Sequence, residues 1–171
     1  MKTKISALTI LLTLALAGTS FAATYYVDGA VANDNGSGLS SSPKKYIKSG
    51  LALMSGGDTL IIADGVYTGP NNLCTNNDWE WVGGIPNGTS SKYTTIKAQN
   101  DFGVILDGQG IHCPWAVSEV SYCQIEGIVF RNSGGSGFGQ CMLWYYSDHI
   151  KVLRCAGYET SGDTDVFSFR Y

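Results

Sequence analysis

The chain begins with a continuous apolar stretch and continues with short runs in which apolar and polar residues alternate. Lys2 and Lys4 precede the apolar stretch over residues 10–17, which is too short to cross a bilayer, and the small residue Ala22 follows it. This pattern predicts a signal peptide that is cleaved after Ala22. An uncleaved membrane anchor is the alternative, but no longer apolar run follows to hold the chain in a bilayer.

Residues 23–57 contain one helical pattern. A short β-type run over residues 24–28 and a polar loop come first. Ser42 and Pro43 then predict a helix start, because Ser caps a helix N-terminus and Pro suits its first turn. Four apolar residues follow near helical spacing, and Gly56-Gly57 ends the pattern. We expect this helix to cap the N-terminal end of the β region that follows.

Strand-type runs recur from residue 58 to the end of the chain. Aligning Ile62 with Ile96, Ile125 and Val152 gives intervals of 34, 29 and 27 residues, and alternate side chains of each run would face inward. Short strands at such periods predict the coils of a right-handed parallel β-helix, in which each coil buries its inward face against the next. An antiparallel sandwich or jelly roll also uses short strands between turns and is the competing architecture.

A second run is predicted in the repeating units, over residues 104–107, 140–144 and 166–169, with Phe167 matched to Gln140. No closing helix or polar segment follows the last run, so we expect the solenoid to be truncated at residue 171 and to belong to a longer protein. The predicted organisation is all-β. It comprises a signal peptide (1–22), an N-terminal strand, loop and capping helix (23–57), and the first coils of a parallel β-helix (58–171).

The charge and composition of the chain exclude some classes of binding partner. The leader holds two of the 11 basic residues and none of the 14 acidic ones, so the mature chain has 9 basic and 14 acidic residues and a net charge of −5. Nucleic-acid binding needs basic stripes, which this chain lacks, and no amphipathic basic helix suits a membrane surface. The signal peptide predicts a secreted protein, periplasmic or extracellular, without a membrane span in its mature part, and we expect it to be monomeric.

Five cysteines lie in the mature part of the chain. An odd number in an oxidising compartment leaves at least one thiol unpaired, and the spacing is not that of a zinc site. We expect most of them to be small buried core residues, while a bridge between Cys113 and Cys123 stays open as an alternative.

Three segments together resemble the N-terminal part of the pectate-lyase-like β-helix superfamily. They are Gly57–Tyr67 (GDTLIIADGVY), the run from Thr95 to Gly108, and Ile125–Ser133. The resemblance implies a secreted protein that acts on polysaccharides, and it leaves lyases, polygalacturonases and epimerases open because one fold hosts many activities. The activity that the resemblance favours is that of a polysaccharide lyase-like enzyme acting on a uronate-containing polymer such as pectate or alginate. A non-catalytic carbohydrate-binding or adhesin-type surface protein is the alternative.

A lyase of this kind needs a base for the proton α to a uronate carboxylate and a cation or basic group on that carboxylate. Lys151 and Arg154, on the last aligned strand, are the candidate catalytic residues, although ordinary solvent-facing charges would look the same. Glu159, Asp163 and Asp165 resemble the Asp-rich, calcium-binding turn of one pectate lyase family, which makes calcium the candidate cofactor. Thr164 separates the two aspartates here, and a solvated turn explains the same residues.

Trp79 and Trp81 flank Glu80 in the long insertion over residues 70–91. Alternate side chains of an extended segment share a face, so the two indoles predict a sugar-stacking platform for substrate binding. A lid of two buried indoles over the core is the equally weighted alternative.

Overall fold

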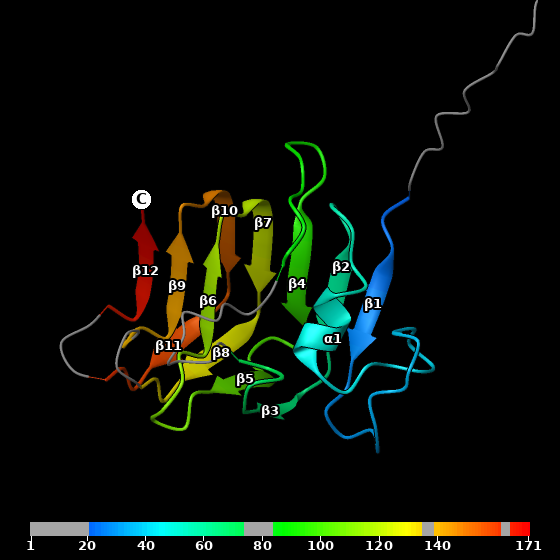
Figure 1. Ribbon diagram of the computed structural model, residues 1–171, viewed down its shortest axis with the longest axis horizontal. Coiled ribbons are helices and arrows are strands. Elements are labelled where there is room, and N and C mark those ends of the chain that lie inside the picture. The colour runs from blue at the N-terminus through cyan, green and yellow to red at the C-terminus, as the bar shows by residue number, and fades with distance from the viewer. Residues whose placement is uncertain (1–20, 74–83, 135–138, 162–164) are drawn as a thin grey trace, which may run out of the picture.

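The computed structural model describes residues 21–73, 84–134, 139–161 and 165–171. Within these residues the chain forms one short helix and twelve short strands (Figure 1). In chain order the elements are β1 (Thr24–Val27), α1 (Ile47–Leu51), β2 (Thr59–Ile62), β3 (Gly65–Tyr67), β4 (Thr94–Ala98), β5 (Val104–Asp107), β6 (Trp115–Ser118), β7 (Ser121–Glu126), β8 (Ile128–Arg131), β9 (Met142–Tyr145), β10 (Asp148–Leu153), β11 (Ala156–Tyr158) and β12 (Phe167–Arg170).

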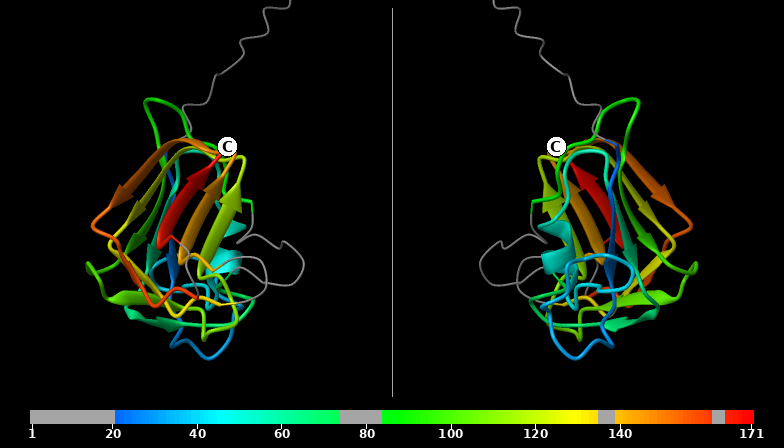
Figure 2. Two further views of the ribbon diagram at one scale, coloured as in Figure 1. Left: turned by 90° about the vertical axis from the view of Figure 1, so that its left-hand side faces the viewer. Right: turned by 90° about the vertical axis from the view of Figure 1, so that its right-hand side faces the viewer.

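The strands form three sheets, and every pairing between named strands is parallel. The strand orders are β1-β2-β4-β7-β10, β3-β5-β8-β11 and β6-β9-β12. Figure 2 views the molecule along its long axis and shows the three sheets on different sides of a common interior. The parallel pairing confirms the all-β prediction and excludes the antiparallel sandwich.

From β4 onward the chain visits the three sheets in turn. We call each set of three consecutive strands a pass: the first is β4–β5–β6, the middle is β7–β8–β9 and the last is β10–β11–β12. Each strand of one pass pairs with its equivalent in the next. The inward side chains of the middle pass are therefore sandwiched between equivalent side chains on both sides.

The predicted aliphatic column is correct in three of its four positions. Ile96 pairs with Ile125, and Ile125 pairs with Val152. Ile62, however, pairs with Ala98, while Leu60 takes the position opposite Ile96, 36 residues earlier in the chain. A slip of two residues keeps both side chains on the inward face because strand side chains alternate with a period of two.

The predicted second run was wrong in its grouping. Residues 104–107 form β5 of the four-stranded sheet, whereas residues 140–144 and 166–169 contribute to β9 and β12 of the three-stranded sheet. Phe167 pairs with Met142, not with Gln140. The sequence pattern does not reveal β8 as a separate strand. One residue, Gly127, makes the corner between β7 and β8, so no turn-forming cluster marks the boundary.

The helix also begins later than predicted. It covers Ile47–Leu51, with Tyr46 as its N-cap and no side-chain capping bond. Ser42 instead closes a tight turn, in which its amide donates to the carbonyl of Leu39 at 2.9 Å. The buried side of α1 packs at the N-terminal end of the core, where a Cβ on Gly50 would lie 2.5 Å from Val27 and 2.8 Å from Leu60. In the described parts of the chain, no helix has the length and apolar character that crossing a membrane requires.

Candidate functional site

The outward face of the five-stranded sheet carries the two basic residues that the sequence singled out, Lys151 and Arg154. Cys123 and Ile125 of β7 are fully buried, so the residues between and beside them point away from the core. The same alternation holds in β4 and β10. The outward side chains across these three strands are Tyr93, Thr95, Lys97, Tyr122, Gln124, Glu126, His149, Lys151 and Leu153.

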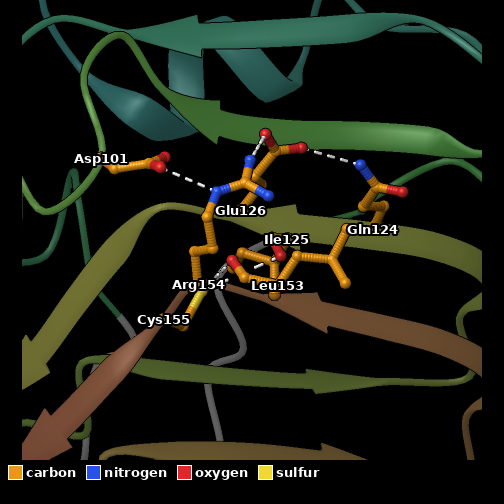
Figure 3. Close-up of polar contacts among 7 residues, drawn as sticks. All are labelled: Asp101, Gln124, Ile125, Glu126, Leu153, Arg154 and Cys155. Carbon is orange, nitrogen blue, oxygen red and sulfur yellow. Dashed lines mark hydrogen bonds and ion pairs between the residues drawn. The ribbon is translucent and has the colours of Figure 1, made fainter.

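Arg154 forms the centre of a charged cluster at one end of this face (Figure 3). Its Nε donates to Oδ2 of Asp101 at 2.7 Å, and its Nη2 donates to Oε1 of Glu126. Gln124 Nε2 donates to the other oxygen of Glu126 at 2.9 Å. The hydrogen bond that Arg154 donates to Asp101, together with the negative charges of Asp101 and Glu126, raises the pKa of Arg154. Arg154 is therefore a permanent cation that can bind an anion but cannot act as a base.

Lys151 lies on β10, which ends one residue before Arg154, and it reaches toward the other end of the face. Its Nζ lies 3.7 Å from the centroid of the Tyr93 ring, across β7 from its own strand. Such a contact is an attraction between the ammonium and the negative ring face. The two predicted basic residues thus share a face, and their strand positions are about 10 Å apart at the usual rise per residue.

A row of rings crosses the three strands beside Lys151. Tyr93 and Tyr122 meet edge to face with centroids 5.7 Å apart, and Tyr122 stacks on His149 at 4.2 Å with an angle of 16° between the rings. Nδ1 of His149 lies 2.7 Å from Oδ1 of Asp148. The hydrogen bonds from His149 and then from Ser121 lower the pKa of Asp148.

The spacing of these three residues in the sequence already indicates that they form a row. Tyr93, Tyr122 and His149 are separated by 29 and 27 residues. These are the same intervals that align Ile96, Ile125 and Val152, so the register that predicts the inward column also predicts the outward row.

The candidate calcium residues lie near the C-terminal end of the described chain. Glu159 follows β11, and its carbonyl accepts a hydrogen bond from the amide of Ser133 at 3.0 Å. Asp165 Oδ2 accepts from the hydroxyl of Ser168 at 3.4 Å. Asp163 lies outside the described residues. Among the side chains that the structure does describe, no group of three His, Cys, Asp or Glu could hold a metal ion.

Trp79 and Trp81, the predicted stacking platform, also lie outside the described residues. Their role as substrate-binding residues stays a prediction. The face of β4, β7 and β10 presents Tyr93 and Tyr122 as aromatic groups of its own.

A second polar cluster joins the ends of β5, β8 and β11. The Asp107 carboxylate accepts from Nε and Nη2 of Arg131 at 2.9 and 2.8 Å, from Nδ2 of Asn132 at 3.1 Å, and from the amide of Gln109 at 2.9 Å. Burial on its own would raise the pKa of Asp107, but the hydrogen bonds from Gln109, Arg131 and Asn132 outweigh it and lower the pKa. This cluster ties neighbouring passes together, and the bond from the Gln109 amide makes Asp107 the cap of the turn that follows β5.

The described cysteines are core residues, as the composition predicts. Cys113, Cys123 and Cys141 are buried and Cys155 is half-buried, and Cys123, Cys141 and Cys155 form no disulfide. The alternative bridge between Cys113 and Cys123 is therefore excluded. Burial raises the pKa of the Cys123 thiol to about 12, which keeps it protonated and unreactive near neutral pH.

No protein-family model matches the chain, and no curated protein matches it. Solved structures similar to it include an alginate lyase from Paenibacillus sp. str. FPU-7, with a TM-score of 0.47 and 16% identity, covering 74% of this chain and 34% of that one. A rhamnogalacturonan lyase has a TM-score of 0.48 and 16% identity, covering 87% of this chain and 62% of that one. Both neighbours are polysaccharide lyases, and this chain spans about a third of the first and about three fifths of the second.

Proposed function

We propose that the three parallel sheets are the first coils of a right-handed parallel β-helix and that the chain is a secreted, polysaccharide lyase-like protein. In this proposal the outward face of β4, β7 and β10 binds a uronate-containing polymer such as pectate or alginate. The observation that carries the proposal is the common placement of Lys151 and Arg154 on this face, beside the row of rings that Tyr93, Tyr122 and His149 form.

The charge of the chain makes such a face necessary for an acidic substrate. The mature part has a net charge of −5, so a uronate polymer would be repelled unless local cations offset its carboxylates. Lys97, Lys151 and Arg154 provide three cations on one face. The guanidinium of Arg154 is half-exposed, and its planar fork suits a carboxylate.

The two basic residues divide the roles that β-elimination requires. The raised pKa of Arg154 assigns it to the carboxylate, whose negative charge grows as the α proton leaves. Lys151, in its neutral form and turned from Tyr93 toward Arg154, is then the base that removes this proton, since it is the other predicted basic residue of the face. The tyrosines of the row pack against the apolar sides of the sugar rings.

Binding without catalysis is the second candidate, and one observation favours it. Both cations already have partners in the protein: Lys151 lies on the ring of Tyr93, and Arg154 holds two carboxylates. A face built to bind carbohydrate needs only the cations and the rings. It would serve a carbohydrate-binding or adhesin-type surface protein.

The experiment separates cleavage from binding on the same samples. The exported chain is incubated with pectate, alginate and glycosaminoglycans, while the ultraviolet absorbance of the unsaturated product is followed and binding is measured by affinity electrophoresis. The variants are Lys151→Ala, Arg154→Ala and, as the matched control, Lys48→Ala on α1, which packs at the N-terminal end of the core.

The lyase proposal predicts cleavage that Lys151→Ala abolishes while binding persists, and binding that Arg154→Ala weakens. Binding without cleavage, weakened by both variants and unchanged in Lys48→Ala, would establish the carbohydrate-binding alternative. Neither cleavage nor binding of any polymer would contradict both.

A further inference from the structure

A buried carboxylate at the start of the five-stranded sheet contacts the residue that follows the predicted signal peptide. Asp58 is only 4% exposed. Its Oδ1 accepts a hydrogen bond from the backbone nitrogen of Ala23 at 2.8 Å, and its Oδ2 accepts from the amide of Ser55 at 2.7 Å. A carboxylate held by amide donors in a buried site keeps much of its desolvation cost, which a positive partner would offset.

The sequence pattern independently places a new positive charge at this nitrogen. The leader pattern predicts cleavage between Ala22 and Ala23. Hydrolysis of that bond consumes one water molecule, and Ala22 leaves with a new carboxylate. Ala23 keeps the nitrogen, which takes up protons to become an α-ammonium, since α-amino groups titrate near pH 8.

We propose that cleavage of the leader completes the fold by forming a buried ion pair between the α-ammonium of Ala23 and Asp58. This proposal rests on the predicted export of the chain and is independent of what the outward face binds. The charge strengthens a hydrogen bond that already exists in the structure. It also fixes the first residue of β1, because the carbonyl of Ala23 accepts from the amide of Thr59 at 2.9 Å.

The surroundings show why the pair would matter for the whole N-terminal end. The carbonyl of Asp58 accepts from Thr95 of β4 at 2.9 Å, and the amide of Gly57 donates to the hydroxyl of Thr94 at 2.9 Å. Lys92 packs its side chain against Gly57, where a Cβ would lie 2.5 Å from it. One carboxylate thus connects the chain start, β2 and β4.

The test compares two chain starts that differ by one residue. A chain that begins at Ala23 places the ammonium on Asp58, whereas a chain that begins at Ala22 keeps the Ala23 amide and its hydrogen bond but moves the charge outward. We expect the Ala23 start to lower the unfolding equilibrium constant about tenfold relative to the Ala22 start, as for a hydrogen bond that gains a charge. Urea unfolding followed by tryptophan fluorescence measures the difference.

Two substitutions assign that difference to Asp58. Asp58→Asn should bring the two chain starts to the same stability. The matched control is Asp28→Asn, since Asp28 caps a local turn at Ala30 and should leave the difference intact. A purely structural role for Asp58 would lower the stability of both chain starts equally and preserve the difference.

A measurement on the unaltered protein covers the case in which Asp58→Asn does not fold. Mass spectrometry of the exported protein should find Ala23 as its first residue. The α-amine of that residue should react with an amine-labelling reagent at least about tenfold more slowly in the native protein than in urea, because the ion pair keeps it protonated and shielded. A different first residue, equal labelling rates, or equal stability of the two chain starts would overturn the proposal.

Discussion

Equivalent residues of the middle and last passes differ in how deeply they are buried. Ile125 of β7 is fully buried, whereas Val152, its partner in β10, is only partly covered. Trp144 of β9 is 1% exposed, whereas Phe169, its partner in β12, is 54% exposed. The side chains are similarly apolar and lie in the same register. The difference shows that burial comes from the neighbouring pass and not from the strand itself.

The other end of the stack is covered differently. There α1 lies beside β1 and β2 (Figure 1) and packs against Val27 and Leu60, whose side chains are almost completely buried. A helix contributes an apolar side without presenting an unpaired strand edge. The molecule therefore has a helix packed on the core near its first strands, whereas apolar side chains are exposed on the last pass.

The largest expected effect separates the middle pass from the last. Ile125→Ala should destabilise the protein by about 2–5 kcal/mol, because it removes a fully buried side chain and leaves a cavity. Val152→Ala, in the same column, should cost roughly 1 kcal/mol or less, since its side chain is already in contact with water. Urea unfolding of both variants measures the two costs. Equal losses would show that the last pass is as well covered as the middle one.

The second-largest loss of stability is expected from a substitution at Gly127, the corner between β7 and β8. Gly127 has a φ of 73°, and a Cβ there would lie 2.7 Å from Oδ1 of Asp101. Gly127→Ala should cost about 2–3 kcal/mol, because the conformation is strained for alanine and the space is filled. Gly69 has a φ of 75° with no atom within 4 Å, so Gly69→Ala, at roughly 1–2 kcal/mol, isolates the conformational part. If both variants lose the same stability in thermal unfolding, the close approach at Gly127 is not real.

The loss of folding stability in acid should depend on Asp107, whose carboxylate joins neighbouring passes. Its pKa is lowered in the folded protein, so its contribution is fully present above the ordinary carboxyl pKa of about 4. That contribution is lost as the pH falls through the lowered value. Asp107→Asn should therefore reduce stability at neutral pH and flatten its decline below about pH 4, where Asp28→Asn controls for the loss of one acidic residue. An unchanged acid profile in Asp107→Asn would contradict the assignment.

The smallest effect on stability is expected at the exposed end. Phe169→Ser should change the free energy of unfolding by no more than about 0.5 kcal/mol, because the side chain has little burial to lose. It should nevertheless reduce self-association at high concentration, since exposed apolar groups beside unpaired strand edges promote it. Light scattering of both proteins over a concentration series tests this. A clear loss of stability would mean that Phe169 is covered in solution.

The inward column at Ile96, Ile125 and Val152 could be predicted from the sequence. The alternation of apolar residues within each strand and the spacing between the strands both place these three residues in one register. The prediction failed at Ile62, where the long insertion before β4 hides a shift of two residues that leaves the hydrophobic pattern unchanged. The charged cluster was beyond prediction for another reason. Arg154 reaches Asp101, 53 residues earlier, and only the stacked backbone brings the two together.

The stacking of parallel strands in register is the claim on which the other conclusions depend. Spin labels on the outward positions Thr24, Thr59, Gln124 and Lys151 measure it directly, because these four positions lie in one register across β1, β2, β7 and β10, with β4 between β2 and β7. From Thr59, stacking in this register predicts about 10 Å to Gln124 and about 14 Å to Lys151, and about 19 Å from Thr24 to Lys151, at one strand spacing per strand. Distances that fail to increase in this order would contradict the parallel stacking.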